Sequence, residues 1–249
     1  MFFCKKESVR RTFALLDTDR NGVISKEEWR RAMQLWMLRT PELEHNLTVV
    51  NCTVPAQYFH VLRRQVGRTT PLVVATPKML LRHRPCVSAL DELAEGTFFR
   101  AVLPDPCITD HNAVRAVVMC SGQVYWVLRH ALAAHKVKHV ALVRLEQLSP
   151  FPYVQVARAT LLHYPQATFH WAQEEHKNMG GWAYVKPRFE TLRQLLSTDL
   201  AWMRPKDAPP LSAAPLTYIG RPASPCATGS ATFHSSETQE HVVSPCLSL

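Results

Sequence analysis

Short β-branched runs alternate with helical segments along most of this chain, and that alternation constrains the fold more than any other feature. Strands are expected at residues 47–51 (LTVVN), 71–75 (PLVVA), 115–120 (RAVVMC), 139–146 (HVALVRLE), 167–173 (ATFHWAQ) and 216–220 (LTYIG). Helices are expected at residues 55–66, 123–135, 153–164 and 181–196. This alternation is typical of βαβ units, so we expect an α/β fold with an open, mostly parallel, doubly wound sheet.

The alternation is interrupted at three places. Residues 76–112 read as an irregular connector, with short helices at 77–83 and 87–93 and a possible strand at 97–102. The proline-rich residues 199–215 predict a surface loop, and the polar run after residue 228 predicts a loosely held last helix or tail. We therefore expect one βαβ unit at residues 46–76, a connector at 77–112 and a larger α/β domain at 113–249.

The segment DTDRNGVISKEE, residues 17–28, matches a calcium-binding loop. Such a loop supplies oxygen ligands from positions 1, 3, 5, 7, 9 and 12, with glycine at position 6. Gly22 occupies position 6, and the ligand positions hold Asp17, Asp19, Asn21, Val23 (through its carbonyl), Ser25 and Glu28. Apolar residues at helical spacing flank the loop, so residues 1–40 are expected to form an α-helical EF-hand. The alternative is an acidic turn that binds nothing.

The sequence contains one such loop, although EF-hands usually pack in pairs. A lone EF-hand leaves its apolar face exposed. Paired sensor sites have dissociation constants of about 10⁻⁷ to 10⁻⁵ M. We expect this lone EF-hand to bind calcium more weakly than that, unless it forms a homodimer or finds a partner surface.

Composition excludes several classes of partner. The net charge is +9, but the 29 Lys and Arg residues are scattered without a block of like charge, so nucleic acid is not an expected partner. No apolar run approaches the roughly 20 residues that span a bilayer. The seven cysteines are widely spaced and form no C-x-x-C pair, which favours a reducing compartment.

Glu174, Glu175 and His176 follow the expected strand at 167–173, where open α/β sheets place their ligands. Acid–base chemistry is conceivable there. However, the chain has no dinucleotide-binding, phosphate-loop or nucleophile-elbow motif. We favour a structural or interface role for these three residues.

Three segments, VALVRLEQLSPFP, WAQEEHKNMGGWAYVKPRF and YIGRPASPCATGS, occur in family order within a longer match over residues 46–230. They closely resemble the C-terminal end of the thiamine-diphosphate-dependent decarboxylase component of the 2-oxoglutarate dehydrogenase complex. The resemblance implies a transketolase-like fold, with residues 46–76 as the last βαβ unit of a pyrimidine-binding domain and residues 113–249 as the C-terminal domain. The complete enzyme binds thiamine diphosphate and magnesium through a G-D-G motif, which this chain lacks. The resemblance therefore implies that the chain alone binds neither and is inactive by itself.

Members of this family bind adenine nucleotides or acetyl-coenzyme A near the junction that the chain retains. The residues that look like the matching polar cluster are Arg63, Arg64, Gln65, Arg82 and His83. Arginine guanidinium groups suit phosphate. The alternative is a solvated helix face and a salt bridge of the connector.

The sequence thus favours a calcium-binding regulatory or assembly piece of a 2-oxo acid dehydrogenase complex of the tricarboxylic acid cycle. Its expected partners are complete decarboxylase subunits or the dihydrolipoyl succinyltransferase. By family the location is the mitochondrial matrix, or otherwise the cytoplasm because no clear transit peptide is present. Two alternatives stay open: a non-enzymatic calcium-binding scaffold, and an incomplete or fused reading frame.

Overall fold

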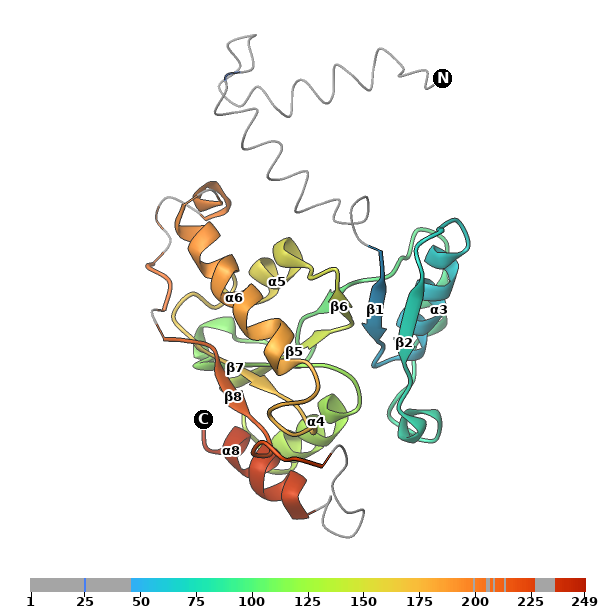
Figure 1. Ribbon diagram of the computed structural model, residues 1–249. Helices are drawn as coiled ribbons and strands as arrows, with labels where there is room; N and C mark the ends of the chain where they lie inside the picture. The colour runs from blue at the N-terminus through green and yellow to red at the C-terminus, as the bar shows by residue number, and fades with distance from the viewer. Residues whose placement is uncertain are drawn as a thin grey trace. The chain divides into compact units, whose positions relative to one another are not determined.

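The structure, a computed structural model, contains the expected alternation of strands and helices (Figure 1). It describes Ser25 and residues 46–198, 200–204, 207, 209–212, 214–226 and 236–249. The chain divides into two units, Met1–Glu44 and His45–Leu249, and every helix and strand below belongs to the second unit.

A three-stranded sheet holds the predicted βαβ unit, which consists of β1 (Thr48–Asn51), α3 (Pro55–Gln65) and β2 (Leu72–Ala75). Pro55 begins α3, where its missing N–H leaves no helical hydrogen bond unmade. The strand order is β2-β1-β6, with β1 parallel to β2 and antiparallel to β6 (Gln147–Ser149). β6 was not predicted from the sequence, and it comes from the segment assigned to the C-terminal domain.

A five-stranded sheet forms the centre of the larger α/β part. It consists of β3 (Val102–Leu103), β4 (Ala116–Cys120), β5 (Val140–Leu145), β7 (Thr168–Ala172) and β8 (Thr217–Ile219). The order is β3-β5-β4-β7-β8, and every neighbouring pair is parallel except β3 with β5. The predicted open, mostly parallel α/β sheet is therefore confirmed.

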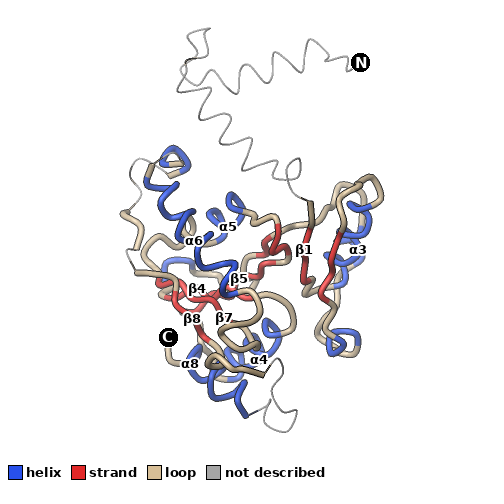
Figure 2. Tube along the Cα trace, in the orientation of Figure 1, coloured by secondary structure: helices blue, strands red, loops and turns tan. Residues whose placement is uncertain are grey.

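Helices cover both faces of this sheet (Figures 1 and 2). On one face, α4 (Val124–Ala134) packs with a π-helix (Gln239–Val243) and α8 (Ser244–Leu247) against Val118 and Cys120 of β4. On the other face lie α5 (Tyr153–Ala159) and α6 (Trp182–Ser197), where the ring of Phe189 lies 5.5 Å from that of Phe169. Because β4 and β5 are buried on both faces, their apolar runs are almost continuous.

Short 3₁₀ turns replace the predicted short helices of the connector. They span Lys78–Leu81, Leu90–Leu93 and His111–Ala113, and a fourth, Ala201–Met203, follows α6. The prediction of a strand at residues 97–102 was wrong for every residue except Val102, where β3 begins. The backbone N–H of Arg100 donates to Oε1 of Gln57 (2.8 Å) instead of to a neighbouring strand.

Two further expectations need correction. The helix predicted to reach residue 164 ends at Ala159, because Thr160 leaves helical geometry (φ −126°, ψ −90°). The end of the chain is not loosely held over residues 236–249: Val242, Val243 and Cys246 are buried against α4. These apolar residues lie beyond most of the polar run on which the expectation rested.

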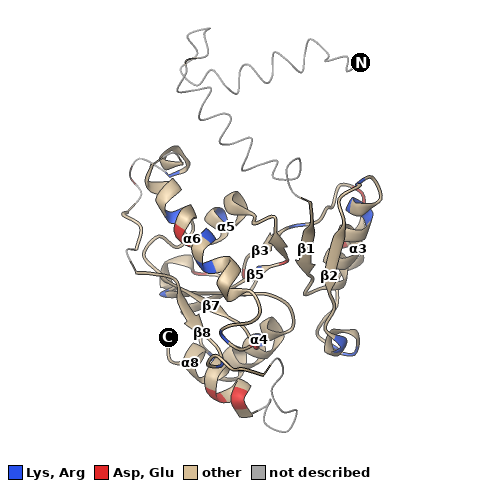
Figure 3. Ribbon diagram, viewed as in Figure 1, with Lys and Arg blue, Asp and Glu red and all other residues tan. Residues whose placement is uncertain are grey.

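None of the helices in the described ranges combines the length and the apolar character needed to cross a bilayer. Lys and Arg residues are distributed over α3, α5 and α6 and do not gather on one element (Figure 3).

Candidate functional site

The predicted calcium ligands precede β1 in the chain. Ser25 is described, but five of the six ligand positions lie outside the described residues: Asp17, Asp19, Asn21, Val23 and Glu28. The donor set consists of oxygen atoms, which fits a hard cation such as calcium. Elsewhere in the described ranges, no three His, Cys, Asp or Glu side chains are grouped so as to hold a metal ion. The calcium site stays a prediction from its donor set.

The predicted nucleotide residues lie at two opposite ends of the βαβ unit. Arg63, Arg64 and Gln65 form the last turn of α3, where Gln65 Nε2 donates to the carbonyl of Thr70 (2.7 Å), just before β2. The other two, Arg82 and His83, follow the far end of β2. Because α3 connects two adjacent parallel strands, its last turn lies near the start of β2, and Arg82 and His83 come after the end of β2. The structure therefore does not bring the two groups together.

These side chains contact neighbouring residues instead. Arg63 donates to the carbonyl of Thr97, and the Arg64 guanidinium lies 4.2 Å from the centre of the Phe99 ring. The His83 ring lies 5.2 Å from that of Trp126. Such contacts are those of a helix surface and a connector, and the nucleotide assignment of this set stays a prediction.

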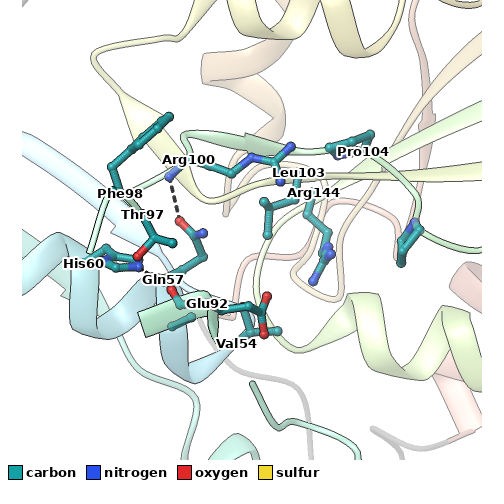
Figure 4. A pocket seen from close by; sticks show the side chains of 13 residues that line it. Val54, Gln57, His60, Glu92, Thr97, Phe98, Arg100, Leu103, Pro104 and Arg144 are labelled. Carbon is teal, nitrogen blue, oxygen red and sulfur yellow. Dashed lines mark hydrogen bonds between the residues drawn. The ribbon is translucent and has the colours of Figure 1, made fainter. Parts of the chain in front are cut away.

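A different cavity, of about 450 Å³, lies where α3 faces β3 and β5 (Figure 4). Its wall from α3 includes Gln57 and His60, and the loop before β3 contributes Thr97 and Arg100. Arg144 of β5 completes the wall. Three segments that are distant in the sequence therefore build one concave site.

Two guanidinium groups give this cavity its charge. Arg100 is exposed, whereas Arg144 is 8% exposed. Arg144 Nη1 donates to Oγ1 of Thr53 (3.1 Å), and its guanidinium stacks on the Tyr125 ring at 4.3 Å. Its Nε has no hydrogen-bond partner among the described residues. Because a guanidinium carries five N–H donors, Arg144 has spare capacity to bind an anion.

The cavity also has one acidic side chain, and it is engaged locally. The Glu92 carboxylate accepts a hydrogen bond from the backbone N–H of Ala89 (2.8 Å). His60 is buried, and its Nε2 contacts the carbonyl of Glu92 (2.7 Å), while its Nδ1 has no partner in the described part of the chain. The lining therefore offers more donors than acceptors, which favours an anionic ligand.

A buried carboxylate, Glu146, lies behind the cavity wall. It accepts hydrogen bonds from the backbone N–H (2.8 Å) and the hydroxyl (2.5 Å) of Thr53, and both residues are fully buried. Burial raises the pKa of Glu146 to about 7, although the bonds from Thr53 and the charge of Arg144 act in the opposite direction. Glu146 therefore changes protonation close to neutral pH.

Glu174, Glu175 and His176 do follow β7, as predicted. Both carboxylate oxygens of Glu174 accept from Nε2 of Gln123 (2.8 Å each). His176 is buried, and its Nδ1 contacts the carbonyl of Pro222 (2.9 Å). These contacts join β7 to α4 and to the loop after β8, which agrees with the structural role favoured from the sequence.

Comparison with known proteins identifies the family. A family model described as "2-oxoglutarate dehydrogenase C-terminal" matches residues 87–245. The chain belongs to this 2-oxoglutarate dehydrogenase family. A second model, described as EF hand, matches residues 9–33, which include the whole predicted calcium loop.

Three longer relatives illustrate the family. The chain is 39% identical to "2-oxoglutarate dehydrogenase, mitochondrial" of Dictyostelium discoideum over 233 residues, which are 91% of this chain and 20% of the relative. It is 40% identical to "2-oxoadipate dehydrogenase complex component E1" of Xenopus laevis over 205 residues, 80% of this chain and 20% of the relative. It is 41% identical to "2-oxoglutarate dehydrogenase-like, mitochondrial" of Rattus norvegicus over 195 residues, 76% of this chain and 18% of the relative. The chain thus spans about a fifth of the length of these members of the 2-oxoglutarate dehydrogenase family.

Proposed function

We propose that the chain is a calcium-binding regulatory or assembly piece that associates with complete decarboxylase subunits of a 2-oxo acid dehydrogenase complex. An exposed apolar surface on the βαβ unit supports this proposal. Three apolar side chains on the outer face of α3 are each 44% exposed: Tyr58, Phe59 and Leu62. Val66, which caps the C-terminus of α3 at helical spacing from these residues, is 88% exposed. Val73 of β2 is 49% exposed, and β2 pairs on one side only in the described sheets.

Such a surface indicates a protein partner. Large apolar side chains that gather on one helix face mark interaction sites more often than single exposed residues do. A strand edge with unpaired N–H and C=O groups can accept a further strand. A complete decarboxylase subunit, which shares this fold, is the partner that we propose, and the dihydrolipoyl succinyltransferase is the second one to test.

Decarboxylation by this chain alone is not proposed. The chain has no G-D-G sequence to hold magnesium and the diphosphate of thiamine diphosphate. Without that motif the proposed function assigns the chain no catalytic step. Two of the relatives above carry "mitochondrial" in their names, which supports a mitochondrial location.

The association can be tested by isothermal titration of the full chain with a purified complete decarboxylase subunit and, separately, with the succinyltransferase. We expect Leu62→Asp to weaken binding at least about tenfold, because it places a charge at the centre of the apolar surface. Leu81→Asp is the matched control, since Leu81 is 87% exposed but lies outside α3. Absence of binding by the wild type would favour the non-enzymatic calcium-binding scaffold instead.

Calcium binding is tested separately on the full chain. We expect one site by calorimetry, and we expect Glu28→Gln to abolish it because a bidentate carboxylate closes the loop. The neighbouring Glu27→Gln is the matched control, since position 11 of the loop is not a ligand position. Binding that survives Glu28→Gln would contradict the ligand assignment.

The cavity beside Arg144 supports a second function, which is binding of an anionic effector such as a phosphate-bearing nucleotide. Arg144 lies on the cavity wall and is buried, and a buried guanidinium is costly unless an opposite charge compensates it. We expect AMP to bind more tightly than adenosine, because only AMP carries a phosphate that Arg144 and Arg100 can bind. Arg144→Met and Arg100→Met are expected to remove this preference, whereas the exposed Arg84→Met is expected to keep it. Equal binding of AMP and adenosine to the wild type would contradict the proposal.

A further inference from the structure

Arg144 joins the cavity to a buried hydrogen-bonded group behind it. The Thr53 hydroxyl accepts from Arg144 Nη1 (3.1 Å) and donates to the Glu146 carboxylate (2.5 Å). Arg144 lies in β5 and Glu146 directly follows the last residue of that strand, and the side chains of both reach the Thr53 hydroxyl. One end of this group touches the cavity and the other end holds a carboxylate away from water.

The backbone around Glu146 is held firmly. Its carbonyl accepts from the N–H of Asn51 (2.8 Å), and its own N–H donates to the carbonyl of Ala101 (2.9 Å). The Thr53 carbonyl accepts from Trp126 Nε1 (3.0 Å) and from the Cys86 thiol (3.2 Å). A proton can therefore move on or off Glu146 without a large displacement of the strands.

The other titratable groups near Glu146 do not offer it a competing charge. Three cysteine thiols lie close enough to interact electrostatically with Glu146: Cys52, Cys86 and Cys120. Burial raises the pKa of all three thiols, so they are neutral near pH 7. Beyond Arg144 lies a second group on α4 and the loop after β3: Tyr125, Arg129 and Asp105, in which Arg129 and Asp105 form their own ion pair. Arg144 is thus the charge that most directly stabilises ionised Glu146.

The hydrogen bonds in this group remain possible in both protonation states. With Glu146 ionised, the Thr53 N–H and hydroxyl both donate to it. With Glu146 neutral, one oxygen still accepts from the Thr53 N–H, and the new O–H donates to the Thr53 hydroxyl oxygen. What changes is the charge: neutral Glu146 leaves Arg144 as a buried cation without an opposite charge.

We propose that Glu146 takes up one proton from solvent when an anion binds Arg144 in the cavity, so that anion binding is linked to pH. This inference rests on the proposed anion site. An anion beside Arg144 supplies the opposite charge that Glu146 otherwise provides, and it also repels the carboxylate. Both effects favour the protonated carboxyl. By reciprocity, protonation of Glu146 strengthens anion binding by the same factor.

Anion binding is expected to weaken as the pH rises above about 7. Burial already places the pKa of Glu146 at about 7, and a bound anion raises it further. Below pH 6 the carboxyl is protonated with or without the anion, so the affinity does not depend on this group. Above pH 7 binding requires uptake of a proton, so the dissociation constant rises with pH by up to about tenfold per unit.

Sulfate is the probe of choice, because it does not titrate in this range. Calorimetry of the full chain in two cationic buffers with different ionisation enthalpies gives the number of protons taken up per sulfate. At pH 7.5 we expect between about 0.3 and 0.8 proton for the wild type, because a carboxyl with a pKa of about 7 is already about one quarter protonated there. We expect a clearly smaller number for Glu146→Gln. The dissociation constant of the variant should change less between pH 6 and pH 8.5. All other titratable groups are common to both proteins, so the difference between them isolates Glu146.

Two controls make the result decisive. Glu240→Gln changes an exposed glutamate on the C-terminal helical segment and should behave as the wild type. The C=O stretch of protonated Glu146, identified by its absence in Glu146→Gln, should grow in the infrared spectrum when sulfate is added at pH 7.5. Equal proton uptake in Glu146→Gln and the wild type would overturn the linkage but leave the anion site intact. Absence of sulfate binding at every pH would overturn both the linkage and the anion site.

Discussion

Replacing Glu146 with Gln is expected to change how the free energy of unfolding depends on pH. Burial raises the pKa of Glu146 from the ordinary value of 4.5 to about 7 in the folded protein. Between these two values the folded protein holds a proton that the unfolded chain has already released. The wild type therefore loses stability as pH rises through this window, and Gln, which does not titrate, removes that loss.

The size of the effect follows from the two pKa values. A shift from 4.5 to about 7 corresponds to about 3 kcal/mol in total. About 2.5 kcal/mol of this falls between pH 5 and pH 8. The carbonyl of Gln can accept the bond from the Thr53 N–H, and its amide can donate to the Thr53 hydroxyl, so the local structure has no reason to rearrange.

Urea unfolding at pH 5, 6, 7 and 8, followed by circular dichroism, measures this difference directly. We expect the free energy of unfolding of Glu146→Gln, relative to the wild type, to increase by about 2.5 kcal/mol from pH 5 to pH 8. Other titrating groups are common to both proteins and cancel. Glu240→Gln should show no such trend. Parallel pH profiles for Glu146→Gln and the wild type would refute the claim that Glu146 titrates near neutrality.

Three further substitutions test the fold around the site. Asp105→Ala should lower the free energy of unfolding by about 3–5 kcal/mol, because it leaves the partly buried Arg129 without its ion pair. It also leaves the N–H of Leu142, which donates to Asp105 (2.8 Å), without an acceptor. A loss below about 1 kcal/mol in urea unfolding would contradict this. Gly122→Ala should cost about 1–3 kcal/mol, because Gly122 has φ +71° and a Cβ there would lie 2.3 Å from Nδ2 of Asn51; an unchanged melting temperature would argue against it. Val242→Asp should destabilise by more than about 3 kcal/mol by burying a charge against α4; wild-type stability would show that the C-terminal helix is dispensable.

The sequence was most informative where local pattern and burial agree. The runs that became β4, β5 and β7 are apolar, short and bounded by turns, and they form the parallel centre of the larger sheet. Pro55 located the start of α3 correctly because proline fits the first helical turn. The strand β6 was missed because its three residues are paired by a partner, β1, nearly a hundred positions earlier in the chain, and no local pattern encodes that pairing.

The cavity was missed for a related reason. Arg100, Gln57 and Arg144 lie on three separate segments, and tertiary structure alone brings them together. One signal was present in the sequence: Arg144 and Glu146 are opposite charges within an otherwise apolar strand. Charges in a buried strand need partners. The predicted cluster of Arg63, Arg64 and Gln65 with Arg82 and His83 instead grouped residues that the crossover of α3 places apart.

The pairing of β6 with β1 also determines where the chain can be cut. A truncated protein that starts at residue 87, where the family match begins, would retain Glu146 and β6 but lose Thr53 and β1. The carboxylate would then face water without its two donors, and β6 would present an open edge to other molecules. The start of the family match is therefore not the start of a folding unit, and the smallest part expected to fold without aggregation begins before residue 48.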